Sequence, residues 1–253
     1  MIFDIFVISF LFFIGIFLGF CAVLFGLKAP LKDSEYFNTC NNCNSKYRWY
    51  ELIPIISYFV NKGKCKYCNN KLSWWYVVLE MISGILFSLG YIKYNFSYEM
   101  LIFDLLIVLL VIIFVSDFNY FIILDSPLII FGTLVLILKY IFFGFEAFLI
   151  SLCSGFLIFI FMMIVKYLGD KAFKQESIGG GDIKLAMFFG FVLGIRLSIL
   201  ALVVGSFLAF PYAIYCSISD KQKEIPFGPF LVMGLVIVFM FMEPLKYFLN
   251  IIF

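Results

Sequence analysis

Long apolar runs separated by short polar segments dominate the chain. A helix needs about 17–25 apolar residues to cross the hydrocarbon core of a bilayer. We therefore predict an all-α polytopic membrane protein with about eight transmembrane helices, at residues 3–27, 75–93, 99–116, 127–143, 146–168, 182–195, 197–217 and 228–252. Residues 182–217 are divided because Arg196 interrupts a run that is too long for one crossing. The first run lacks the basic leading end of a cleavable signal peptide, so we expect it to be retained.

Lysine and arginine residues gather in the loops on one side of these predicted spans. That side holds most of the 18 basic residues, and its largest loop is residues 28–74. Cytoplasmic loops carry the excess of Lys and Arg, so this side is predicted to be cytoplasmic and both chain ends to lie outside. The chain then divides into a first transmembrane helix at 1–27, a small cytoplasmic loop domain at 28–74 and a helix bundle at 75–253.

The composition agrees with a membrane protein and limits its chemistry. Hydrophobic residues make up 64% of the 253 residues and charged residues 13%, whereas soluble domains are about half apolar and a quarter charged. The chain contains no histidine. This excludes Ser-His-Asp and Cys-His catalysis as well as histidine-ligated metal sites. Carboxylates, lysines, tyrosines or cysteines must therefore carry any reaction.

Four of the seven cysteines form two CxxC pairs in the predicted cytoplasmic loop. The pairs are Cys40 with Cys43 and Cys65 with Cys68. Thiols stay reduced in the cytoplasm, and paired CxxC motifs are typical of a tetrahedral Zn²⁺ site. The loop has few aliphatic residues, so a structural metal would replace a hydrophobic core as its source of stability. A regulatory disulfide and a loop without metal are the alternative interpretations.

Two carboxylates are predicted to reach the same cytoplasmic leaflet from distant parts of the chain. Asp117 ends the third predicted span, and Asp182 begins the sixth, directly after Gly179, Gly180 and Gly181. Acidic residues in or bordering a membrane span are costly and are functional candidates by default. Two carboxylates that share one proton can activate a water and polarise a carbonyl without histidine. The alternative is an Asp in the first turn of a helix with no catalytic role.

Helix dipoles suggest how the two carboxylates divide the work. A helix N-terminus stabilises a negative charge and a helix C-terminus disfavours one. Asp182 is predicted at an N-terminus and Asp117 at a C-terminus. Our hypothesis is therefore that Asp182 is the resting base and Asp117 the resting acid, although the titration would belong to the pair.

Several motifs occur in an order and spacing that resemble those of a known family. They are the double CxxC, Glu51–Pro54, Gly63, Val78–Glu80, Asp117 with Asp125, Gly179–Lys184 and Ile225–Phe230. With these motifs, residues 19–235 resemble the type IV prepilin peptidases, bifunctional leader peptidase/N-methyltransferases among the GxGD membrane aspartyl proteases. Lys28-Ala29-Pro30 and Leu124 depart from the usual family pattern. These departures bear on loop shape and substrate fit rather than on the acid/base pair.

The resemblance implies a function and a set of site residues. Asp117 and Asp182 would be the catalytic pair, Gly179–Gly181 with Lys184 the active-site loop, and the four loop cysteines the ligands of a structural Zn²⁺. The enzyme would cleave the basic leader from prepilin or pseudopilin precursors, after Gly and usually before Phe. It would then methylate the new N-terminus with S-adenosyl-L-methionine. For that cofactor Glu80 is the candidate residue.

The same resemblance implies a location and a set of partners. The protein would lie in the cytoplasmic (inner) membrane of a bacterium as a multi-pass enzyme, with its active site facing the cytoplasm. Its partners would be pilin-type precursors and membrane lipid, and no nucleic acid is expected. The resemblance points to a type IV pilus or to protein secretion, and it leaves adhesion, secretion and DNA uptake open as the purpose.

Two other functions remain open at this point. One is a GxGD-type signal or preflagellin-like peptidase without methyltransferase activity. The zinc loop disfavours it, because such minimal proteases resemble only the later part of this chain. The other is a transporter or assembly subunit whose carboxylates bind ions. Inverted repeats are typical of transporters, and the sequence shows no convincing internal repeat.

Overall fold

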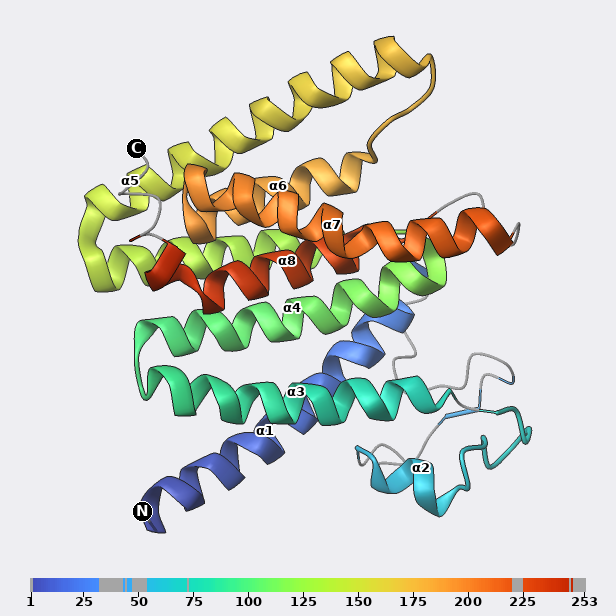
Figure 1. Ribbon diagram of the computed structural model, residues 1–253. Coiled ribbons are helices and arrows are strands. Elements are labelled where there is room, and N and C mark those ends of the chain that lie inside the picture. The colour runs from blue at the N-terminus through green and yellow to red at the C-terminus, as the bar shows by residue number, and fades with distance from the viewer. Residues whose placement is uncertain are drawn as a thin grey trace. The chain divides into compact units, whose positions relative to one another are not determined.

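Helices account for most of the described chain. The computed structural model describes residues 2–31, 43, 45–46, 54–71, 73–219, 225–245 and 247 (Figure 1). Besides the helices, these residues contain an isolated antiparallel β-bridge between Lys64 and Lys71. Contacts between helices group the chain into two compact units, Met1–Val115 and Ser116–Phe253. The all-α fold class is confirmed, whereas the division into three functional segments stays a prediction.

The first unit is built on the crossing of α1 (Ile2–Lys28) with α3 (Trp74–Tyr94). A Cβ on Gly15 of α1 would lie 2.8 Å from the Cα of Gly84 on α3. Ser83 Oγ donates a hydrogen bond of 2.6 Å to the Gly15 carbonyl. Such small residues allow helix backbones to approach closely inside a membrane. The remaining elements are η1 (Ala29–Leu31), α2 (Ile56–Val60) and α4 (Tyr98–Tyr120), the last of which continues into the second unit.

The second unit begins with a helical hairpin. The long helix α5 (Asp125–Phe173) has a non-helical residue, Gly144, at φ 83° and ψ −176°. A positive φ of this size favours glycine, and the chain folds back there (Figure 1). The two arms of α5 correspond to the separate spans that the sequence predicted at 127–143 and 146–168.

Three further helices complete the second unit. They are α6 (Gly180–Leu193), α7 (Ile195–Ser219) and α8 (Gly228–Met240). Gly194, at φ 75°, separates α6 from α7. This break confirms the division of the long run near Arg196. The helices α7 and α8 run side by side (Figure 1), and a Cβ on Gly234 would lie 2.6 Å from the backbone nitrogen of Gly205.

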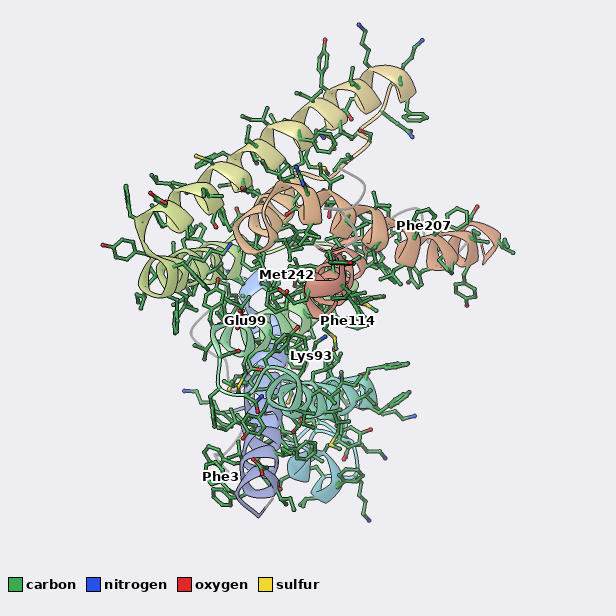
Figure 2. All side chains as sticks on the ribbon, turned by 60° about the vertical axis from the view of Figure 1, so that its left-hand side comes forward. Phe3, Lys93, Glu99, Phe114, Phe207 and Met242 are labelled. Carbon is green, nitrogen blue, oxygen red and sulfur yellow. The ribbon has the colours of Figure 1, made fainter. Side chains whose placement is uncertain are left out.

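The number of membrane spans differs from the prediction. Five of the described helices, α1, α3, α4, α5 and α7, are long and apolar enough to cross a membrane. Apolar side chains project from the helices, for example Phe3 on α1 and Phe207 on α7, which are both exposed (Figure 2). The predicted eight spans are not confirmed, because α6 has 14 residues and α8 has 13. Helices of that length rise about 21 Å or less and fall short of a full crossing. Residues 246 and 248–252 of the last predicted span lie outside the described residues.

The contact between α5 and α6 predicts a sensitive position. A Cβ on Gly190 of α6 would lie 2.5 Å from the Cα of Gly155 on α5, so Gly190→Ala must push two backbones apart. We expect this overpacking to lower the stability of the detergent-solubilised protein by about 1–3 kcal/mol. Thermal unfolding measures the loss. Gly132→Ala, where the nearest atom is 3.4 Å away on a side chain, is the matched control and should unfold as the wild type does. Equal midpoints for both variants would refute the close contact.

Candidate active site

Both predicted catalytic aspartates line one cavity of the second unit. The cavity has a volume of about 1100 Å³. Asp117 reaches it from the last turn of α4 and Asp182 from the first turn of α6. Asp117 is close enough to Asp182 for an electrostatic interaction between the two carboxyl groups. The structure therefore brings together two carboxylates that are distant in the sequence.

The rest of the cavity wall is largely apolar. Its apolar side chains come from the second arm of α5, from α7 and from the segments next to the aspartates. They include Phe161, Val165, Ile199, Val203, Phe207, Ile225 and Phe227. Such a wall suits an apolar polypeptide better than a charged small molecule, because polar groups buried against it would lose their hydration. The aspartates with their glycine run thus form a polar patch on an apolar surface.

The glycine run fits tightly against its neighbours. Gly179 is the N-cap residue of α6, and a Cβ there would lie 3.2 Å from Asp182 Oδ2. A Cβ on Gly181 would lie 2.9 Å from the Cβ of Ile123, whereas one on Gly180 would meet nothing within 4 Å. None of the three glycines has a φ in the left-handed region. Close approach, rather than unusual backbone torsions, is therefore the reason for glycine at positions 179 and 181.

Asp117 receives a hydrogen bond that sequence reasoning missed. The backbone N–H of Gly228, the first residue of α8, donates to Asp117 Oδ2 over 2.9 Å. The N-terminus of α8 thus faces the carboxylate and stabilises its negative charge. Our assignment of Asp117 as the resting acid rested on the C-terminus of α4 alone, and α8 counteracts it. The only available signal was the Ile225–Phe230 motif, which does not reveal its partner.

Lys184 of the predicted active-site loop points away from the aspartates. It is not among the residues that line the cavity. Its Nζ lies 2.7 Å from both carboxylate oxygens of Asp125, at the start of α5. Two residues that are two positions apart on a helix do not share a face, which explains why Lys184 and Asp182 diverge. The sequence contained both members of this ion pair but no signal that they meet.

Three of the four predicted zinc ligands lie together in the first unit. The Sγ atoms of Cys43, Cys65 and Cys68 are within 4.8 Å of one another, and those of Cys43 and Cys65 are 4.0 Å apart. Thiolates around Zn²⁺ lie about 3.8 Å apart, since Zn–S bonds are about 2.3 Å long. The donor set and its spacing therefore fit this metal. Cys40, the fourth predicted ligand, lies outside the described residues.

A glycine and two backbone hydrogen bonds shape the turns on either side of Cys65. Gly63 has φ 66°, and a Cβ there would lie 2.9 Å from the Tyr58 ring. The Cys65 N–H donates to the Asn70 carbonyl over 2.9 Å, and the Asn69 N–H donates to the Cys65 carbonyl at the same distance. This tight turn brings Cys68 back towards Cys65. Of the Glu51–Pro54 motif, residues 51–53 lie outside the described residues.

Two family models match the chain in succession. The model of the bacterial peptidase A24 N-terminal domain matches residues 7–94, and that of the type IV leader peptidase family matches residues 105–214. Together they cover well over half of the chain, and the second contains both aspartates. The chain belongs to the type IV leader peptidase family. It is therefore a peptidase, and its apolar helices make it a multi-pass membrane protein.

Curated relatives support this family along most of their length. A prepilin leader peptidase/N-methyltransferase of Bacillus subtilis (strain 168) is 28% identical over 92% of this chain and 94% of its own length. Proteins with the same name in Vibrio cholerae and Neisseria gonorrhoeae are 27% and 29% identical, over 79% and 84% of this chain and 79% and 77% of their own lengths. No solved structure matches the chain.

The relatives' names include a methyltransferase, which makes the surroundings of Glu80 relevant. Glu80 on α3 is buried, and its Oε2 accepts a hydrogen bond of 3.0 Å from the Ile55 N–H. This bond ties the segment that leads into α2 to the helix. A role of Glu80 in binding the methyl donor stays a prediction.

Proposed function

We propose that the chain cleaves the leader peptide from type IV prepilin-like precursors, with Asp117 and Asp182 as the catalytic pair. The observation that carries the proposal is the meeting of these two carboxylates in one largely apolar cavity. The family and the names of the curated relatives supply the substrate class.

The geometry supports acid/base catalysis by two carboxylates that share one proton. The ionised member takes a proton from a water, which attacks the carbonyl of the scissile peptide bond, while the protonated member donates to the carbonyl oxygen. When the tetrahedral intermediate collapses, the proton moves to the leaving amine. The Gly228 N–H holds Asp117 in place, and the α6 N-terminus supports a charge on Asp182. The proton is thus proposed to belong to the pair.

The apolar wall supports a substrate that comes from the membrane. A prepilin has a basic leader followed by an apolar helix, so its cleavage point would lie at the membrane boundary. The apolar side chains of α5 and α7 could receive the apolar helix, while the aspartates meet the junction. The distribution of Lys and Arg in the sequence supports a boundary on the cytoplasmic side of the inner membrane.

We further propose that Cys40, Cys43, Cys65 and Cys68 hold a structural Zn²⁺, which would stabilise a segment with little apolar core.

We also propose that the new N-terminus is methylated. That proposal rests on the methyltransferase in the relatives' names and assigns no residue to the S-adenosyl-L-methionine site.

Mass spectrometry of a processed precursor tests both activities together. The protein is co-expressed with a precursor that carries a basic leader, a Gly–Phe junction and an apolar helix. We expect a mature N-terminus that begins with the Phe and carries the mass of one added methyl group. A correct cut without the methyl group would support the peptidase without methyltransferase activity. An intact leader would contradict the proposed function and favour a non-enzymatic role.

A further inference from the structure

Two short segments that carry the aspartates run against each other in the second unit. One leads from Asp117 to Asp125, and the other covers residues 179–184. Three contacts connect them. The two aspartates interact electrostatically, a Cβ on Gly181 would touch Ile123, and Lys184 pairs with Asp125. Together these contacts fix the position of one segment relative to the other, which we call their register.

The ion pair is the polar contact at the outer end of this register. The Lys184 Nζ lies 2.7 Å from each carboxylate oxygen of Asp125, a short charge-assisted contact to both. Both side chains are about half exposed, at 52% and 55%. Lys184 does not line the cavity of the aspartates, so we expect it to make no contact with a peptide bound between them. Any effect of this pair on catalysis must pass through the position of the two segments.

The chain before the glycine run is already held by the end of α5. Asp170 Oδ1 accepts hydrogen bonds from the Ser177 N–H and Oγ, at 2.6 Å and 2.8 Å. Lys166 Nζ donates to the Ile178 carbonyl over 2.7 Å. These contacts fix the residues directly before Gly179. They do not fix the residues after the run, where Asp182 lies.

The three consecutive glycines are held only by the close approach of their backbone to neighbouring residues, at Gly179 and Gly181. They have the greatest backbone freedom and no side chains to pack, and a Cβ on Gly180 would meet nothing within 4 Å. A displacement of about 1 Å at a reacting group can cost a factor of about 10² in rate. The glycine run therefore needs a contact on each side to place Asp182 accurately.

We propose that Asp125 and Lys184 are a positioning pair, which holds the register between the two segments and so sets the separation of the aspartates. The inference rests on the proposed function, since it assigns the pair to the same reaction. It does not require the pair to contribute much to global stability, because half-exposed ion pairs are typically worth about 1 kcal/mol or less. Its effect should appear in the rate of the chemical step.

Charge exchange tests this proposal with the full-length protein in detergent micelles and the Gly–Phe precursor as substrate. We expect Asp125→Lys and Lys184→Asp each to lower kcat at least about tenfold, since the reacting groups are displaced. KM should stay within about twofold, because the apolar wall that binds substrate is untouched. The double exchange restores the pair in reverse and should bring kcat back to within about threefold of the wild type. Lys184→Arg, which keeps the charge, should likewise retain most of the activity.

Two controls separate positioning from other causes. Lys171→Asp makes the same change in net charge as Lys184→Asp, at an exposed site near the end of α5, and should leave kcat unchanged. If the reversed charges prevent folding, Asp125→Asn, Lys184→Met and their combination replace them. In that series the kcat of the double variant should be no lower than that of either single variant. The first substitution already removes the ion pair, so the second removes no further interaction.

The outcomes distinguish this inference from the proposed function. Wild-type kcat in the single variants, a double exchange as slow as the singles, or a loss confined to KM would overturn the positioning role. A wild-type protein that leaves the precursor intact would instead refute the proposed function itself.

Discussion

Asp117→Asn and Asp182→Asn should each abolish cleavage of a prepilin-type precursor. An amide cannot take a proton from water at neutral pH, and it cannot replace a carboxylic acid as proton donor. General acid/base catalysis contributes factors of about 10² to 10⁴, and the loss of one member disables the whole pair. We expect the cleaved fraction, measured by mass spectrometry of the precursor after incubation, to fall below detection for both variants.

The control for these variants is Asp104→Asn on the same helix. Asp104 is also an acidic residue within a long apolar stretch of α4, but it is not among the residues that line the cavity. Its Oδ1 is buried without a hydrogen-bond partner among the described residues, so an amide should be tolerated there. All three variants should show wild-type thermal unfolding. Substantial cleavage by Asp117→Asn or by Asp182→Asn would exclude the carboxylate pair as the catalytic centre.

Cys65→Ser should remove the metal and unfold the segment around it. Cys65 is 1% exposed, and its Sγ lies within 4.8 Å of those of Cys43 and Cys68. Structural zinc in small domains contributes about 10–16 kcal/mol of apparent binding free energy, so a lost thiolate cannot be replaced by weak packing. We expect the zinc content, measured by atomic emission on the purified protein, to drop from about one ion per chain to near zero. Limited proteolysis should then cut within residues 54–71.

Cys21→Ser is the matched control, because this exposed cysteine of α1 is not part of the thiol cluster. It should retain the zinc and the wild-type proteolysis pattern. Full zinc content in the Cys65 variant would show that the cysteines do not hold the metal. Absence of zinc from the wild type would favour the disulfide or the metal-free loop instead.

The sequence predicted those features that depend on local composition. Apolar run length placed α1, α3, α4, the two arms of α5, and α7, and the break at Gly194 agrees with the division near Arg196. The spans that it predicted at α6 and α8 are not confirmed, because an apolar run does not show where its helix begins and ends. Both aspartates were identified from their places at the ends of apolar runs.

The parts of the site that the sequence did not predict depend on contacts between residues far apart in the chain. The Gly228 N–H meets Asp117 across 111 positions, and Lys184 meets Asp125 across 59. Each residue is unremarkable in its own surroundings, so hydrophobic pattern and propensity contain no information on the pairing. The helix dipole argument counted the helix that carries Asp117 and could not count the one that faces it. The resulting assignment of acid and base therefore stays a prediction.

The hydrogen bond from Gly228 to Asp117 has a consequence for mutational tolerance. Its donor is a main-chain N–H, which every residue except proline possesses. Side-chain variation around position 228 can alter the shape of the cavity, and hence which precursors fit, while the donor itself is retained. Substrate preference could thus drift by ordinary point mutations, whereas the support for the carboxylate would be lost only through a proline or a displacement of the backbone.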